Sequence, residues 1–102
     1  MTTVTLKEKE LPIHFGIGTL RKFSAEAKIP ISEFTDGSMM NRLTLDDLMT
    51  MIFIAFKEGH RKAKKKFSLD LDAVCDLIDD TDGGIEKIMN IFGDTMPFSE
   101  GK

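Results

Sequence analysis

The segment at residues 48–56 (LMTMIFIAF) most constrains the fold, because Thr50 is its one polar residue. A helix of this composition has almost no face to give to water, so it is either the central helix of a domain or packed against a second chain. The segment has about half the length needed to span a bilayer, which argues against a membrane helix. Residues 57–66 are rich in lysine and arginine, and every charged residue from 68 to 86 is acidic. The sequence therefore joins a strongly apolar helix to two segments of opposite charge.

Length and composition predict a single domain. The chain has 102 residues, enough for one modest hydrophobic core. Its 41% hydrophobic and 30% charged residues are typical of a soluble globular protein and not of a disordered one. The net charge of −3 gives no overall attraction to nucleic acid or anionic membranes. Cys75 is the one cysteine, and the polar N-terminus lacks the apolar segment of a secretory signal, so we expect a reducing, cytoplasmic location.

The pattern of apolar residues predicts an N-terminal β-hairpin over residues 3–15. Apolar and polar residues alternate with a period of two on both sides of a polar turn at residues 7–10. Pro12 has no N–H to donate to a neighbouring strand, so its strand should be an edge or pair on one side only. Residues 31–41 are expected to form a loop with at most a single helical turn.

Helical periodicity after the hairpin predicts about four helices, at residues 19–27, 44–66, 68–79 and 84–93. Thr44 should cap the longest of them with Asp47 three residues on, and Ser68 should cap the next. Residues 1–97 then make a single domain, and residues 98–102 make a flexible tail. The predicted fold class is α+β, mostly α, with an N-terminal β-hairpin followed by about four helices around one long central helix.

Two rows of apolar residues run along the predicted central helix. The first row comprises Leu45, Leu48, Ile52, Ala55 and Gly59. The second row comprises Met49, Phe53, Phe56, His60, Ala63 and Phe67. The second row is either plain core or a surface for a partner, and the sequence leaves both interpretations open. Under the partner hypothesis, the binding residues are Met49, Phe53, Phe56 and His60, with Lys57, Arg61 and Lys64 at the rim.

The sequence predicts neither catalysis nor a bound metal or cofactor. His14 and His60 have no second ligand at metal-binding spacing, so structural or surface roles are expected for both. The acidic cluster at residues 79–82 is not a calcium loop, because the twelfth loop position, which should be a bidentate glutamate, is Met89. Cys75 falls at a core position of an acidic helix, which disfavours a thiolate and predicts a small buried hydrophobic residue.

The basic run at residues 57–66 allows three interpretations. Lys57 and Arg61 are spaced i, i+4 and repel each other mildly, so something should offset this charge. The run is either solvated or paired with the acidic residues that follow it, or it binds an acidic protein, or it binds nucleic acid. No aromatic residues are interleaved with it for stacking on bases, which disfavours nucleic acid. The runner-up function is therefore a small regulatory or nucleic-acid-binding module that uses this run.

Three segments, in order, carry a family resemblance. Residues 11–16 (LPIHFG) form a strand that ends in an aromatic-glycine pair, followed by a first helix with LRKF at residues 20–23. Residues 45–70 form an apolar helix that ends in a polar segment containing glycine, and residues 74–97 supply two last helices. In their order and spacing these segments resemble the tail assembly chaperones of long-tailed bacteriophages and their prophages, over most of the chain.

The resemblance implies a non-enzymatic role in virion assembly. Such chaperones coat the long, aggregation-prone tape-measure protein, recruit tail-tube subunits and leave before the particle is finished. They are often made in a short form and a frameshifted longer form, and this chain resembles the short form. The implied partners are the tape-measure and tail-tube proteins in the bacterial host cytoplasm, with self-association open. The family offers no site motif to carry over, so the binding residues named above come from the helix pattern alone.

Overall fold

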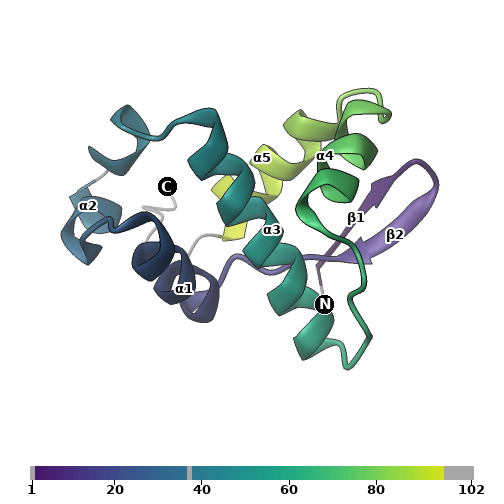
Figure 1. Ribbon diagram of the computed structural model, residues 1–102, viewed down its shortest axis with the longest axis horizontal. Helices are drawn as coiled ribbons and strands as arrows, with labels where there is room; N and C mark the ends of the chain where they lie inside the picture. The colour runs from purple at the N-terminus through teal and green to yellow at the C-terminus, as the bar shows by residue number, and fades with distance from the viewer. Residues whose placement is uncertain (1, 37, 96–102) are drawn as a thin grey trace.

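The computed structural model describes residues 2–36 and 38–95, and a small antiparallel hairpin lies at one end of its helices (Figure 1). In chain order its elements are β1 (Thr3–Leu6), β2 (Lys9–Pro12), α1 (Ile17–Ala27), α2 (Ile31–Asp36), the 3-10 helix η1 (Ser38–Asn41), α3 (Leu45–Lys62), α4 (Leu71–Asp79) and α5 (Gly84–Thr95). The predicted fold class, α+β and mostly α, is confirmed. The predicted tail at residues 98–102 lies outside the described residues.

The hairpin is shorter than predicted. β1 and β2 pair antiparallel, with Thr3 opposite Pro12, and the turn consists of Lys7 and Glu8 alone. Both turn residues have positive φ, 48° and 68°, which matches the two-residue turn favoured by the twist of paired strands. Pairing stops at Pro12 and not at residue 15. The chain then leaves the sheet, and the N–H of His14 donates to the carbonyl of Ala55 in α3 at 3.0 Å.

Helix α3 lies in the middle of the fold, with α1 and α2 on one side and the hairpin, α4 and α5 on the other (Figure 1). The predicted capping box is confirmed: the Asp47 N–H donates to Thr44 Oγ1 at 3.0 Å, and the Thr44 N–H donates to Asp47 Oδ2 at 3.3 Å. The helix ends at Lys62 and not at residue 66. Lys64 adopts a left-handed conformation with φ of 60°, and the next N–H bonds back to the carbonyl of His60 at 2.9 Å, which closes the last turn.

Other predicted boundaries also move. The expected loop at residues 31–41 contains α2 and η1, because Pro30 both ends the preceding helix and opens the next; its carbonyl accepts from the Glu33 N–H at 3.0 Å. Helix α4 begins at Leu71 and not at Ser68, since Asp70 is the residue whose side chain caps it, accepting from the Ala73 N–H at 2.8 Å. Helix α1 begins at residue 17, and α5 continues to residue 95.

The buried apolar residues of the core come from β1, from the chain that leaves the hairpin and from helices α1 to α5. Phe15 meets Phe92 of α5 edge to face, with ring centroids 5.2 Å apart, and the fully buried Phe56 points inward from α3. Gly59 of α3 lies directly against the chain that leaves the hairpin. A Cβ at that position would be 2.5 Å from the backbone nitrogen of Ile13 and 2.6 Å from the carbonyl carbon of Pro12. The hairpin exit can approach α3 this closely only because residue 59 has no side chain.

Candidate protein-interaction site

The seven predicted partner-binding residues do not form one surface. Phe56 has an exposed fraction of 0% and His60 is also buried, so these two residues are not available to a partner in this structure. Met49 and Phe53 are half-buried. The three predicted rim residues are exposed: Lys57, Arg61 and Lys64.

The burial of His60 has a clear cause. The chain reverses after α3, and Phe67 folds back against the helix, with its ring centroid 4.7 Å from that of His60 and 5.6 Å from that of Phe53. Nδ1 of His60 lies 2.8 Å from the carbonyl oxygen of Phe56, so the imidazole has a polar partner inside its own helix. The second apolar row of α3 is thus covered in its C-terminal half by the chain itself. Of the roles expected for His60, structural, surface or partner-binding, its burial agrees with the structural one.

Phe53 belongs to a groove on one side of α3. Its apolar walls are Phe53, Ile54 and Leu71, and its polar lining is Glu26, Thr50 and Lys57. The Nζ atom of Lys57 lies 5.5 Å from the centroid of the Phe53 ring, in the position of a cation–π contact. This Phe53 groove therefore offers apolar surface beside two exposed charges of opposite sign, Lys57 and Glu26.

Met49 belongs to a different groove, formed where α3 begins and where α4 and α5 pass beside it. This Met49 groove is lined by Leu45, Met49, Cys75, Ile78, Asp79 and Ile85. Leu45 has an exposed fraction of 73%, whereas Ile52 and Ala55 of the same apolar row are fully buried. Cys75 is half-buried and not fully buried as expected. Burial raises the pKa of its thiol, and the carboxylates of four nearby aspartates raise it further: Asp72, Asp76, Asp79 and Asp46.

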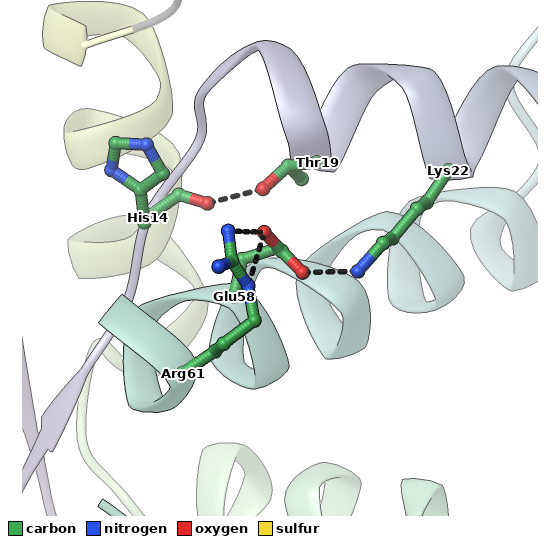
Figure 2. A network of polar contacts seen from close by, with 5 residues as sticks. All are labelled: His14, Thr19, Lys22, Glu58 and Arg61. Carbon is green, nitrogen blue, oxygen red and sulfur yellow. Dashed lines mark hydrogen bonds and ion pairs between the residues drawn. The ribbon is translucent and has the colours of Figure 1, made fainter. Parts of the chain in front are cut away.

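The most tightly held charged group was not predicted. Glu58 has a side chain only 3% exposed, and its carboxylate lies between Lys22 of α1 and Arg61 of α3 (Figure 2). Oε1 accepts from Nη2 and Nε of Arg61 at 2.8 and 3.2 Å, and Oε2 accepts from Nζ of Lys22. The hydrogen bonds from Arg61 are the largest cause that lowers the pKa of Glu58 to about 2, and those from Lys22 add to them. The sequence signal was available, since Glu58 is one acidic residue inside a basic run and three residues before an arginine.

The same region ties the hairpin exit to α1. The hydroxyl of Thr19, which is fully buried, donates to the carbonyl of His14 at 2.5 Å. The ring of His14 points away from the Glu58 carboxylate (Figure 2), so these two groups do not form an acid–base pair. Burial is the main cause that lowers the pKa of His14, and the charge of Lys62 lowers it further. The arrangement is that of a structural clamp between α1, α3 and the hairpin.

The structure bears on one of the interpretations of the basic run, its pairing with the acidic residues that follow it. Within residues 2–36 and 38–95, however, no ion pair joins the run to those residues, and Arg61 pairs with Glu58 instead. A shallow basic groove results, with Glu58 in its floor; it is lined by Lys22, Lys57, Glu58, His60, Arg61, Lys65 and Phe67.

Two further findings concern chemistry and membranes. Among the residues that the structure describes, no group of three or more His, Cys, Asp or Glu side chains is placed to hold a metal ion. None of the described helices is long and apolar enough to cross a bilayer.

Comparison with protein-family models, with characterised proteins and with solved structures finds no significant match to this chain. The surface of α3 and the resemblance of the sequence segments are therefore the two features that bear on function.

Proposed function

We propose that this chain is a non-enzymatic tail assembly chaperone of a long-tailed bacteriophage or prophage. In this role it binds the tape-measure protein, tail-tube subunits or both in the host cytoplasm during tail assembly and is absent from the finished virion. The support from sequence is the order of its segments: a strand ending in Phe15 and Gly16, an LRKF helix, an apolar central helix and two last helices. A mostly helical fold with an N-terminal hairpin agrees with that order.

The observation that carries the proposal is the surface of α3. Both of its partly exposed predicted residues, Met49 and Phe53, line apolar grooves that open to solvent. A client rich in amphipathic helices binds such grooves by placing its apolar face in them. Burying one further Phe-sized or Met-sized side chain contributes roughly 1.5–3 kcal/mol. Each contact is weak, but many copies bound along one long client give strong total binding.

The basic groove supports the second candidate, a regulatory or nucleic-acid-binding module. Lys22, Lys57, Arg61 and Lys65 converge on it. Against this function stands the Glu58 carboxylate, which pairs with two of these four cations and places a negative charge where a phosphate would bind. Salt dependence separates the candidates, because phosphate contacts weaken steeply with added salt and apolar contacts do not.

Co-expression tests the proposal directly. The chain is produced with the large, helix-rich tape-measure protein encoded nearby, and the product is analysed by size exclusion with light scattering. We expect a soluble complex with many copies of this chain per client. An insoluble client beside a free, folded small protein would contradict the proposal, and steeply salt-dependent binding to an oligonucleotide would then favour the second candidate.

A matched pair of substitutions locates the contact. Phe53→Asp places a charge in the Phe53 groove, and we expect it to remove client solubilisation while circular dichroism still reports a folded protein. Ile17→Asp is the control, since Ile17 is 59% exposed on α1 and lines neither groove. Equal loss in both variants would show that the effect is not specific to α3, and an unfolded Phe53→Asp protein would assign Phe53 to the core.

A further inference from the structure

The Met49 groove combines an apolar floor with a strongly negative rim. Leu45 and Ile85 stand at its edges, with exposed fractions of 73% and 36%, while Met49, Cys75 and Ile78 form the half-buried floor. The exposed aspartates around it come from both neighbouring helices: Asp46 of α3 and Asp72, Asp76 and Asp79 of α4. No ion pair between described residues involves any of these four carboxylates.

This charge is unfavourable for the isolated chain. Asp72 and Asp76 are spaced i, i+4 on α4 and repel each other. Asp79 lies in the last turn of that helix, which contains no basic residue, although the C-terminal end of a helix dipole disfavours anions. The positive end of α4 already has its favourable acidic residues in Asp70 and Asp72. Chain stability thus accounts for Asp72, and for Asp46 in the first turn of α3, but not for Asp76 and Asp79.

We propose that the Met49 groove binds one amphipathic helix of a partner protein, with the apolar face of that helix on Met49 and Ile78 and lysine or arginine residues on its flanks. The groove supplies apolar surface for the first contact, and the four unpaired aspartates supply the charge complementarity for the second. The biological identity of the partner rests on the proposed function, whereas the chemistry of the bound helix rests on the groove alone.

Two designed peptides test the charge rule with the full chain. Both are amphipathic helices with the same leucine face; one carries lysine on its flanks and the other carries glutamate. Fluorescence anisotropy should show the lysine peptide binding on the order of tenfold tighter, because several exposed charge pairs change sign together between the two peptides. Equal affinity for both peptides, or no binding of either, would overturn the proposal.

Cys75 provides a footprint of the site, since it is the one cysteine in the chain and lies in the groove. Saturating lysine peptide should slow alkylation of its thiol several-fold, and the same excess of glutamate peptide should not. Binding without protection of Cys75 would place the peptide elsewhere and overturn the proposal. Protection that arises without peptide, on raising the protein concentration, would identify a second copy of this chain as the occupant and would overturn it as well.

Substitutions separate the apolar and charged parts of the site. Leu45→Ser should lower the affinity for the lysine peptide several-fold, and Ile17→Ser should leave it unchanged. The two changes are matched, because both residues are exposed and each is the first residue of its helix. Asp76→Lys combined with Asp79→Lys should reverse the preference, so that the glutamate peptide binds more tightly. Lysine near the end of α4 is favoured by the helix dipole, so the folded state should tolerate this pair. An unchanged preference would refute the assigned rim.

The outcomes also distinguish this inference from the proposed function. If the lysine peptide protects Cys75 while the co-expressed tape-measure protein stays insoluble, the groove chemistry holds and the chaperone role fails. If the tape-measure complex forms while Cys75 in it reacts as fast as in the free chain, the chaperone role holds and the client binds elsewhere.

Discussion

Replacing Gly59 with alanine should destabilise the fold, although alanine is the better helix former. The new Cβ would lie 2.5 Å from the nitrogen of Ile13, 2.6 Å from its Cα and 2.6 Å from the carbonyl carbon of Pro12. Ordinary contacts between such atoms are about 3.5–4 Å, so α3 and the hairpin exit have to separate by about 1 Å. The three atoms that the new Cβ would meet are all backbone atoms, so no flexible side chain can move away to make room.

The magnitude follows from three contributions. Overpacking of a close contact costs about 1–3 kcal/mol. The separation also stretches the 3.0 Å hydrogen bond from His14 N–H to the Ala55 carbonyl, worth about 1 kcal/mol. The gain in helix propensity from glycine to alanine offsets about 1 kcal/mol of this. We therefore expect a net loss of roughly 2 kcal/mol in the free energy of unfolding.

Gly93 of α5 provides the matched control, because among the described residues no atom beyond the adjoining helix backbone lies within 4 Å of the position of a Cβ. Gly93→Ala should gain up to about 1 kcal/mol from propensity alone. Urea unfolding at neutral pH gives the change in unfolding free energy of each variant against the parent chain. In thermal unfolding, the midpoint temperatures of the two variants should move in opposite directions by roughly 4–8 °C per kcal/mol. If Gly59→Ala is as stable as Gly93→Ala, the close approach of α3 to the hairpin exit is not present in solution and the reasoning is wrong.

Three further predictions concern single groups. Glu58→Gln should lower the free energy of unfolding at pH 7 by about 2 kcal/mol, a value reduced from the full pKa shift because Lys22 and Arg61 are solvent-exposed. Because folding lowers the pKa of Glu58 from 4.5 to about 2, its contribution is complete above pH 4.5 and is lost as the pH falls toward 2, so urea titrations of parent and variant should converge in acid. Thr44→Ala removes the capping box of α3 and should cost about 1 kcal/mol in the same assay, and Thr44→Ser should restore most of it. Alkylation of Cys75 should be slower than that of a free thiol at the same pH and should accelerate in Asp79→Asn, since burial and the neighbouring carboxylates raise its pKa.

Local signals in the sequence predicted much of the fold. The period-two alternation located the hairpin, and Thr44 with Asp47 located the start of α3, because capping depends on neighbouring residues alone. The end of α3 was not predictable in this way. Lys64 adopts the left-handed conformation that glycine usually adopts at the end of a helix. The hydrogen bond from the Lys65 N–H to the His60 carbonyl, which closes the last turn, favours this conformation. Likewise Ser68 and Asp70 are both good caps, and the prediction of Ser68 was wrong because Asp70 caps the helix.

The candidate site was harder to predict because burial depends on contacts between distant segments. Phe56 and His60 share a helical row with Met49 and Phe53, so periodicity assigned all four to one surface. The return of Phe67 and the approach of the hairpin exit divide that row into a buried part and a part open to solvent. Glu58 was overlooked for a related reason: its role depends on Lys22, which is 36 residues away in the sequence.

The two walls of the Met49 groove are fixed to the core to different degrees, and this bears on what the groove can accept. On the α3 side, Gly59 holds the helix against the hairpin exit, and the Glu58 carboxylate ties it to α1 through Lys22. Helix α4 has nine residues, and Val74 is the one among them that is fully buried. A short helix with few buried contacts opens locally at lower free energy than the core elements. The groove thus pairs a firmly held wall with a less firmly held one, and this would suit the proposed binding of partner helices that share a charge pattern but differ in the size of their apolar side chains.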